Sequence, residues 1–503
     1  MKKQILILLL LGNALAAFAQ KSYNIINYGA KTGAKYNNAI AIQKAIDAAA
    51  KNKGGRVIIP AGNFTTGPII LKSGVEIHFN DDAALLGSTN RFDYTEGKMA
   101  VISAKGQHDI AITGNGTING QGRDLIMNVL QLLTDGKIQD DQWKIKRPAE
   151  KNRTNIFSIV DCTNVRVTGV TLRDASGWVQ TYKNCTGVVI DHMKVESVAY
   201  WNNDGIDIVD SKNVKITNSF FNAADDAICL KSEDANKSCE NIWVENCTLR
   251  SSASGFKLGT GSVGAFRKIT VKNLTVYNTY RSAIALESVD GALIEDVDIR
   301  NVTGKNVGNA VFIRLGHRNT DARYSSIRNV LIDGVKADVP NAKPDVGYPL
   351  EGPAPKVAPH NLVPASITGL PGHLVQNVTL QNIDITYGGG ANKTFAYAPI
   401  NELDKVTENV PGYPEFTMFG ELPSWGLYVR HAEGIKLNNF KIGVMESDFR
   451  PALIFDDVTG LSLNNLTVPQ TASLPTIVYK GVGQLTTSGV TLPAGNNAVI
   501  TQK

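Results

Sequence analysis

The stretch Asn164-Val165-Arg166-Val167 decides the fold, because a short apolar anchor behind a polar residue recurs along most of the chain. Taking six anchors as equivalent gives successive spacings of 23, 26, 28, 27 and 24 residues: Val165, Val188, Val214, Ile242, Ile269 and Leu293. Short alternating strands, Asn and Gly turns and a period in the twenties are typical of a parallel β-helix. The sequence therefore predicts an all-β protein, a right-handed, single-stranded parallel β-helix.

Two other folds explain the pattern less well. A leucine-rich repeat has a similar period, but its Leu-x-x-Leu-x-Leu pattern is missing. An antiparallel sandwich does not keep its anchors at such constant spacing. A solenoid also accounts for the length, because its core grows along one axis without thickening. We therefore expect residues 20–503 to form one domain.

The ends and the interruptions of the repeat have predicted roles. In Ala39 to Ala50, the residues Ile42, Ala45, Ile46 and Ala49 share one helical face, and Lys51 to Gly55 end the pattern. We expect this short helix to cap the N-terminal end of the solenoid. Residues 340–372 and 388–425 lack the repeat and are predicted to form walls of a substrate cleft.

The N-terminus resembles a secretory signal peptide. Lys2-Lys3 precedes an apolar run from Ile5 to Leu11, and Ala17-Phe18-Ala19 provides a cleavage site. We therefore expect residues 1–19 to be removed and the protein to be exported, either to the periplasm or to the medium. No other stretch is apolar and long enough to span a membrane.

Composition excludes several classes of function. The net charge is only +5 and no Lys/Arg cluster marks a nucleic-acid surface, so neither a nucleic acid nor a membrane is an expected partner. The five cysteines are odd in number and confined to one region, so they are predicted not to form a disulfide framework, and most of them are predicted to be buried small residues. The histidines show no metal-ligand spacing, and no phosphate-binding glycine loop is present. We expect no metal and no cofactor.

Three aspartates carry the chemistry. Asp225 and Asp226 follow Asp204 by 21 and 22 residues, close to one repeat, so the three carboxyl groups are expected on one face of adjacent coils. Neighbouring carboxyl groups are what glycosidic cleavage by an acid and a base requires. Crowding raises the pKa of one of them, which then donates a proton, while the others stay charged. The alternative is that they are ordinary turn residues, like Asp207 and Asp210.

Several motifs along the mature chain resemble glycoside hydrolase family 28, the polygalacturonase family. The motifs that carry the resemblance are Gly54-Gly55-Arg56-Val57, Asn115-Gly116-Thr117-Ile118-Asn119-Gly120, Asn203-Asp204-Gly205-Ile206-Asp207, Asp225-Asp226 and Tyr413-Pro414-Glu415. The resemblance implies that Asp225 is the general acid, and that Asp204 and Asp226 hold and deprotonate water with inversion at the anomeric carbon. Asn202 and Lys231, which flank these aspartates, are predicted to bind substrate.

Two parts of the family signature are missing. Ser254 stands where the family has the His of Gly-His-Gly, and Ala285 and Glu287 stand where it has the Arg and Lys of Arg-Ile-Lys. In the family those cations bind the carboxylate of galacturonate, as charge-assisted hydrogen bonds allow. We therefore expect unsubstituted polygalacturonate to be a poor substrate.

Four further residues are candidates for substrate binding in place of the missing motifs. Lys257 could contact a substrate anion, or it could be an exposed, solvated lysine. Glu287 could bind sugar hydroxyls or titrate as a fourth carboxyl group, or it could form a salt bridge with Lys257 across adjacent coils. Arg314 and Arg318 could supply a cation to the cleft, or either could pair with Glu287. Aromatic residues of the irregular segments suit stacking on sugar rings or packing on the solenoid: Tyr413, Phe416 and Trp425.

The sequence thus favours a secreted hydrolase of a pectic or related polysaccharide. A lyase or epimerase acting on uronic acids is the first alternative, since parallel β-helices host those reactions as well. A glycan-binding protein with a decayed site is the second. The sugar, the linkage, endo or exo action and the oligomeric state are not determined by the sequence.

Overall fold

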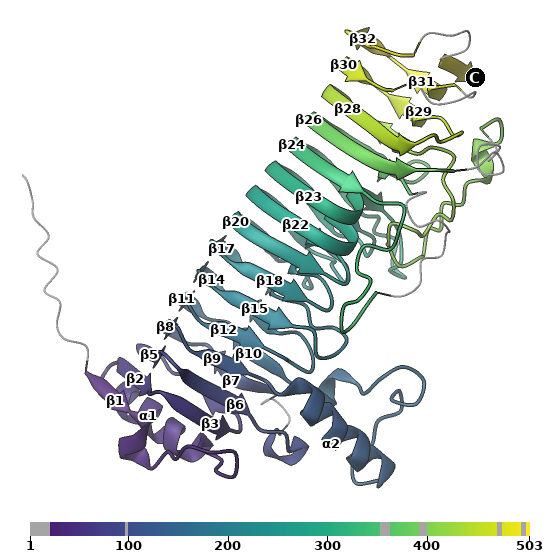
Figure 1. Cartoon of the computed structure of the whole chain (residues 1–503). Helices are drawn as coiled ribbons and strands as arrows, with labels where there is room; N and C mark the ends of the chain where they lie inside the picture. The colour runs from purple at the N-terminus through teal and green to yellow at the C-terminus, as the bar shows by residue number, and fades with distance from the viewer. Residues whose placement is uncertain are drawn as a thin grey trace, which may run out of the picture.

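The computed structural model describes residues 21–95, 99–352, 363–391, 400–469, 475–493 and 499–502. The predicted signal peptide, residues 1–19, lies outside the described residues. Figure 1 shows a long stack of parallel strands that runs the length of the molecule. Each coil contributes a strand to as many as three parallel stacks, which we call the first, second and third stack in chain order.

The first stack runs from the N-terminal end to the C-terminal end. Its strands are β1 (Ser22–Asn24), β2 (Gly55–Ile59), β5 (Val75–Phe79), β8 (His108–Gly114), β11 (Thr163–Thr168), β14 (Thr186–Asp191), β17 (Lys212–Thr217), β20 (Ser238–Ser251), β22 (Ala265–Ser288), β23 (Leu293–Leu315), β24 (Ser326–Val339), β26 (Val375–Gly389), β28 (Lys436–Glu446), β30 (Ser462–Thr467) and β32 (Thr486–Ser488).

The second stack is separate in the N-terminal half and then merges into the long strands β20, β22 and β23. Its separate strands are β3 (Gly62–Thr66), β6 (Ala83–Gly87), β9 (Thr117–Asn119), β12 (Thr171–Arg173), β15 (Lys194–Ser197) and β18 (Phe220–Ala223).

The third stack contains the ends of β22 and β23. Its other strands are β4 (Ile69–Ile70), β7 (Ala100–Lys105), β10 (Asn155–Val160), β13 (Gln180–Lys183), β16 (Asp207–Val209), β19 (Ile228–Lys231), β21 (Phe256–Leu258), β25 (Ala365–Thr368), β27 (Leu427–Glu433), β29 (Leu453–Thr459), β31 (Ile477–Gly483) and β33 (Val499–Gln502).

The register agrees with the anchors read from the sequence, with one exception. Val165 pairs with Val188, and the ladder continues through Val214 and Ile242 to Ile269. The next partner of Ile269 is Val297, whereas Leu293 pairs with Ala265. The last predicted equivalence was therefore wrong by four residues. Leu293 is only partly buried, whereas Val297 is buried and follows Asp296, which has φ of 56°, as Val165 follows Asn164. The polar left-handed residue, and not Leu293, therefore marks the anchor.

The polar residue before each anchor has a conformational role. Asn164, Asn213 and Asn241 have φ of 53°, 55° and 56°, a left-handed conformation that asparagine tolerates better than most residues. Their side chains also stack between coils, since Nδ2 of Asn241 donates to Oδ1 of Asn213 at 2.7 Å. The Asn positions thus turn the chain and align successive coils.

Helices flank the N-terminal coils. The predicted cap is confirmed as α1 (Ala39–Lys51), which buries Ala41, Ile42, Ala45, Ile46 and Ala49. A second helix, α2 (Gly122–Thr134), was not predicted, although Leu125, Val129 and Leu133 follow helical spacing and pack with Tyr94. Short 3-10 helices are η1 (Ile25–Tyr28), η2 (Arg91–Asp93), η3 (Glu150–Asn152) and η5 (Leu403–Lys405).

The first irregular segment and the cysteines were also the subject of predictions. The segment 340–372 is not irregular throughout, because β25 within it pairs Ser366 with Phe312 and completes a coil. All five cysteines are buried and free, as predicted. Among the described residues, none of the helices has the length and apolar character needed to cross a membrane.

Candidate active site

The three aspartates lie on the turns between the second and third stacks. Asp204 precedes β16, and Asp225 and Asp226 precede β19 in the next coil. The N–H of Gly205 donates to the carbonyl oxygen of Asp226 at 2.9 Å, so Asp204 is level with Asp226. One carboxylate oxygen from each of the three lies within 4.8 Å of the others. The structure therefore brings the predicted catalytic residues together.

Asp226 is held by positive groups. It is buried, its Oδ2 lies 3.0 Å from Nζ of Lys257, and its Oδ1 accepts a hydrogen bond from the N–H of Ser254 at 3.0 Å. Burial by itself would raise its pKa, but Lys257, Lys231 and Arg281 together outweigh burial and lower the pKa of Asp226. Asp226 is thus charged at neutral pH and suited to accept a proton.

Asp225 has the opposite character. Its Oδ1 accepts from the N–H of Asp226 at 3.0 Å, and its Oδ2 accepts from Nδ2 of Asn202 at 3.2 Å. Burial and the neighbouring charge of Asp226 raise the pKa of Asp225. It is partly exposed and lines the cleft. A carboxyl group with a raised pKa that lines the cleft is suited to donate a proton.

Asp204 differs from the expectation that it stays charged. It is buried, and its Oδ1 has no hydrogen-bond partner within the described protein. Burial first, and then the charges of Asp225 and Asp207, raise the pKa of Asp204 well above its usual range. Burial, with the neighbouring charges second, therefore raises the pKa values of Asp204 and Asp225, whereas Lys257 contacts Asp226 and lowers its pKa.

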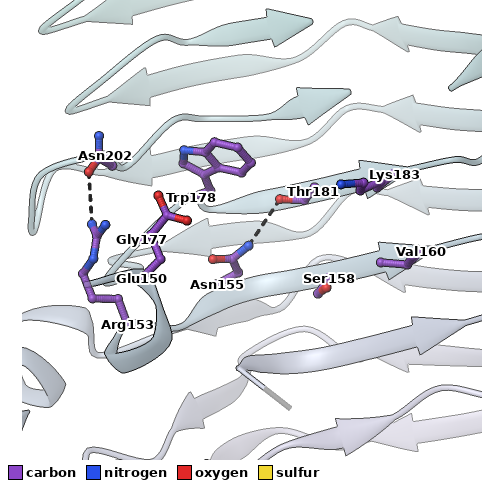
Figure 2. A pocket seen from close by; sticks show the side chains of 10 residues that line it. All are labelled: Glu150, Arg153, Asn155, Ser158, Val160, Gly177, Trp178, Thr181, Lys183 and Asn202. Atoms are coloured by element: carbon purple, nitrogen blue, oxygen red, sulfur yellow. Dashed lines mark hydrogen bonds between the residues drawn. The ribbon is translucent and has the colours of Figure 1, made fainter. Parts of the chain in front are cut away.

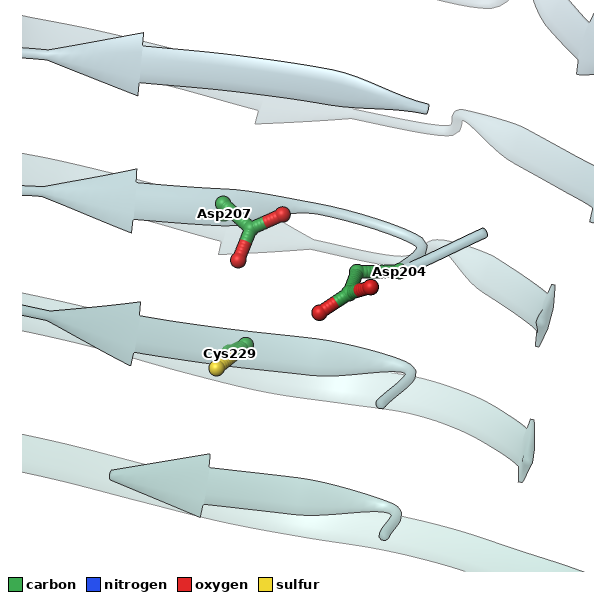
Figure 3. A group of neighbouring side chains, drawn as sticks. All are labelled: Asp204, Asp207 and Cys229. Atoms are coloured by element: carbon green, nitrogen blue, oxygen red, sulfur yellow. The ribbon is translucent and has the colours of Figure 1, made fainter. Parts of the chain in front are cut away.

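Asp204 also belongs to a second group, with Asp207 and Cys229 (Figure 3). Burial raises the pKa of Asp207 to about 8, although Lys231 lies 3.7 Å away and opposes this shift. Burial also keeps Cys229 a thiol by raising its pKa. A neutral thiol and a nearby ammonium make this group a poor fit for a divalent cation, which needs deprotonated ligands.

Lys257 and Glu287 form the salt bridge that was one of the predicted alternatives. Nζ of Lys257 lies 3.4 Å from Oε2 of Glu287, and both side chains are buried. Burial raises the pKa of Glu287 to about 7, against the opposing effect of Lys257. Glu287 therefore does not present an isolated negative charge to a substrate, as replacement of the family's Lys by Glu had suggested.

The two arginines are both engaged by other groups of the protein. Arg314 is fully buried and donates to the carbonyl oxygens of Glu408, Gly369 and Asn409, which corrects its predicted role. It anchors the second irregular segment to the solenoid. Arg318 donates to both carboxylate oxygens of Asp290, at 2.8 and 2.9 Å, and does not pair with Glu287.

Only one of the three loop aromatics is accessible. Phe416 and Trp425 are 1% exposed and pack in the apolar core, so they pack on the solenoid and do not stack on sugar rings. Tyr413 is 46% exposed, and its hydroxyl oxygen accepts a hydrogen bond from Nζ of Lys257 at 3.2 Å. Arg318 lies 5.4 Å from the centre of the Tyr413 ring. Tyr413 therefore links the second irregular segment to the catalytic turns.

The cleft in front of Asp225 has a volume of about 480 Å³ and includes residues that the sequence analysis missed. Trp201 is 47% exposed beside Asn202, and Arg281 contributes positive charge near Asp225 and Asp226. Further cations come from Lys146 and Arg147, in a basic run visible in the sequence. Arg281 lies in no such basic run, and its place in the cleft depends on a bulge in β22 between Thr279 and Ser282.

The first irregular segment lines this cleft, and the second contacts Arg281, which lines it. Glu351 and Gly352, of the first segment, line it. The hydroxyl of Ser252 donates to the carbonyl oxygen of Leu350 at 2.5 Å, which holds that segment against the solenoid. Arg281 lies 3.8 Å from Glu415 of the second segment.

Comparison with known proteins gives a consistent result. The profile of glycosyl hydrolases family 28 matches residues 50–344, more than half of the chain. An exo-poly-α-D-galacturonosidase of Dickeya chrysanthemi is 25% identical over 370 residues, covering 64% of this chain and 60% of that protein. An endo-polygalacturonase of Pectobacterium carotovorum subsp. carotovorum is 25% identical over 295 residues, covering 54% and 70%.

A solved structure supports the architecture. The hyperthermoactive exopolygalacturonase of Thermotoga maritima superposes with a TM-score of 0.59 at 21% identity, covering 83% of this chain and 92% of that one. At this identity the likeness concerns the fold, which is thus a β-helix of the kind predicted. The chain spans only 60% of the length of the Dickeya relative, so activity must be argued from the site itself.

Proposed function

Since the chain belongs to glycosyl hydrolases family 28, we propose that it hydrolyses a pectic polysaccharide with Asp225 as the general acid. The observation that carries the proposal is the opposite pKa shifts of two adjacent carboxyl groups. The pKa of Asp225 is raised by burial and by Asp226, while Lys257 leads the cations that lower the pKa of Asp226. Pairs of titrating groups with separated pKa values are the usual acid and base of a hydrolase.

The proposed reaction consumes one water for each bond cleaved. Asp225 gives its proton to the leaving glycosidic oxygen, and Asp226 takes a proton from the attacking water. Asp204, whose pKa is raised, holds that water by hydrogen bonding rather than by charge. The hydroxyl of the water becomes bonded to the anomeric carbon, so both products are complete sugars.

The structure supports the cleft in front of Asp225 as the place of cleavage. Trp201 offers an exposed ring, and Asn202 fixes the acid through its hydrogen bond to Oδ2 of Asp225. The basic residues Lys146, Arg147 and Arg281 give the cleft a positive character that suits a polymer containing acidic sugars. Export by the N-terminal signal peptide would bring the enzyme to such a polymer.

A uronic-acid lyase or epimerase is the second candidate on this fold. Those reactions need a base at the proton next to the sugar carboxylate. Lys257 is the nearest buried amine, but its contacts with Asp226 and Glu287 raise its pKa and keep it protonated. A protonated lysine cannot act as that base, so the site favours hydrolysis over a lyase or epimerase reaction.

The experiment is digestion of a panel of pectic, algal and host polysaccharides by the purified protein. Hydrolysis is expected to release reducing ends from at least one pectic polymer without an ultraviolet-absorbing product. An unsaturated, ultraviolet-absorbing product would identify a lyase. Binding without new reducing ends would identify a glycan-binding protein, and either result would contradict the proposal.

A further inference from the structure

A second hollow lies beside the catalytic cleft, on the side of the N-terminal coils (Figure 2). Its volume is about 230 Å³, below the roughly 300–1,000 Å³ of sites that hold drug-sized ligands. Asn202 lines both the hollow and the catalytic cleft, so the two adjoin at the residue that contacts Asp225. A hollow of this size suits one sugar ring of a longer chain.

Trp178 gives the hollow a fixed apolar surface. Figure 2 shows its ring between Asn202 and the side chains of Asn155 and Thr181. The ring is partly exposed, and Nζ of Lys231 lies 5.1 Å from its centre, a cation–π distance that holds it in place. A rigid aromatic face of this kind binds the apolar C–H face of a sugar at low entropic cost.

The turn that carries Trp178 is also fixed. Asn203 is fully buried, and its Nδ2 donates to the carbonyl oxygens of Ala175 and Gly177, at 2.9 and 2.8 Å. This connects the turn before Trp178 directly to the turn before Asp204. The turn that carries Trp178 is therefore held at a constant position relative to the catalytic carboxyl groups.

Neutral polar groups form the opposite rim. Nδ2 of Asn155 donates to Oγ1 of Thr181 at 3.2 Å, which leaves the Thr181 hydroxyl to donate its own proton elsewhere. Ser158 adds a second hydroxyl. Such groups match the hydroxyls of a sugar, each of which both donates and accepts.

Each positive group of the hollow has a negative neighbour, Glu150 for Arg153 and Glu233 for Lys183. Arg153 donates to the carbonyl oxygen of Trp201 and to Oδ1 of Asn202, both at 3.2 Å. Lys183 is hydrogen-bonded to the carboxylate of Glu233. Glu150 adds a negative charge to the lining. In the hollow, Arg153 and Lys183 are thus matched by Glu150 and Glu233. The described lining of the catalytic cleft has three cations, Lys146, Arg147 and Arg281, against the two carboxyl groups of Asp225 and Glu351.

From this contrast we infer that the hollow around Trp178 is a subsite for a neutral sugar unit of the substrate, next to the unit held in the catalytic cleft. The inference rests on the proposed function, because it assumes that a carbohydrate chain lies along the cleft past Asn202. The inference narrows the class of substrate to polysaccharides in which a neutral sugar, one without a carboxylate, lies next to the bond that is cleaved. Trp178 is its main contact, with Thr181 and Asn155 as hydrogen-bonding partners.

Binding can be tested without turnover. Neutral oligosaccharides of galactose, arabinose and rhamnose, and oligogalacturonates as the acidic counterpart, are titrated into the full-length mature protein by calorimetry and tryptophan fluorescence. Trp178→Ala is expected to weaken binding of a neutral oligosaccharide about tenfold, as loss of an aromatic contact does. Trp178→Phe should keep most of the affinity, and Thr181→Val, which keeps the shape, should weaken it by a smaller factor.

The matched control is Trp243→Ala. Trp243 is also partly exposed, is held by Lys272 at 4.5 Å, and belongs to the first stack. It should leave neutral-sugar binding unchanged. Equal affinity of Trp178→Ala and wild type, absence of binding by all neutral probes, or a preference for oligogalacturonates that depends on Trp178 would overturn the inference. Binding of neutral sugars through Trp178 in a protein that cleaves no polysaccharide would leave the subsite standing and refute only the proposed hydrolysis.

Discussion

Nζ of Lys257 lies 3.0 Å from Oδ2 of Asp226, with 1% of the lysine and 3% of the aspartate side chain exposed. The two residues come from neighbouring coils, and Lys257 is also 3.4 Å from Glu287. One buried cation is therefore shared by two carboxyl groups. It keeps Asp226 ionised at a depth where a carboxylate without a cation would be protonated.

Replacing Lys257 with Met should reduce both activity and stability. The substitution leaves Asp226 and Glu287 buried without their cation, and breaking a buried pair in this way typically costs about 3–5 kcal/mol. The free energy of unfolding, from denaturant titration, and the initial rate on the true substrate are the measurements. Turnover should fall further than the folded fraction does, because the pKa of Asp226 rises.

Lys268→Met is the control for this prediction. Lys268 forms an exposed pair with Glu240 at 3.1 Å, and exposed pairs contribute about 0–1 kcal/mol. If Lys257→Met lowered the free energy of unfolding and the initial rate no more than Lys268→Met does, the buried cation would have little effect on Asp226.

Asp225→Asn should abolish turnover while the protein stays folded. The amide keeps the shape and the hydrogen bond from the N–H of Asp226 but supplies no acidic proton. Loss of general acid catalysis is typically worth about a hundredfold to ten-thousandfold in rate. The measurements are initial rates and the circular dichroism spectrum. Near-normal activity would remove Asp225 from the role of acid, and loss of folding would make it a turn residue.

The stability of the protein should contain a contribution from Glu287 that decreases as pH rises. Burial raises the pKa of Glu287 from 4.5 to about 7, so between these pH values the folded state holds a proton that the unfolded state has released. The unfolding free energy therefore falls with pH in this window. Glu287→Gln should flatten the profile between pH 4.5 and about 7.

Glu240→Gln tests the sign of that effect. Glu240 is partly exposed, and its pKa is lowered, chiefly by a hydrogen bond from Lys268. Its contribution to stability is present at neutral pH and is lost as pH falls, the reverse of Glu287. A Glu287→Gln profile parallel to that of wild type would show that this carboxyl group titrates normally.

Unsubstituted polygalacturonate should be cleaved poorly compared with a branched or mixed pectic polymer. Ala285 carries no charge and Glu287 is paired with Lys257, so neither position offers a cation to a carboxylate. The values of kcat/KM for the two polymers decide the matter. Efficient hydrolysis of polygalacturonate that is lost in Arg281→Gln would contradict the prediction and assign carboxylate binding to Arg281.

The first product should have the anomeric configuration opposite to that of the substrate. Asp226 is 2% exposed and both of its oxygens are engaged, by Lys257 and by the N–H of Ser254, so it reaches the sugar through water and not by direct attack. Proton NMR immediately after cleavage records the anomer. Retention would recast one aspartate as a nucleophile, as carboxylate oxygens within 4.8 Å of one another would permit.

The sequence by itself determined the β-helix, the cap α1 and the grouping of Asp204, Asp225 and Asp226. These features follow from a local period, because residues one coil apart in a solenoid share a face wherever the repeat holds. The assignment failed at Leu293, because the anchor of that coil is Val297, which follows the left-handed Asp296.

Only the tertiary structure decided the charges of the site. Lys257 reaches Asp226 from the next coil, Arg281 is positioned by a bulge, and Arg153, Lys146 and Arg147 come from the segment after α2, which has no period. Arg314 is buried under the second irregular segment instead of facing the cleft. A pKa depends on burial and on the distance to every nearby charge, and these quantities exist only when non-repeating segments have folded onto the repeating ones.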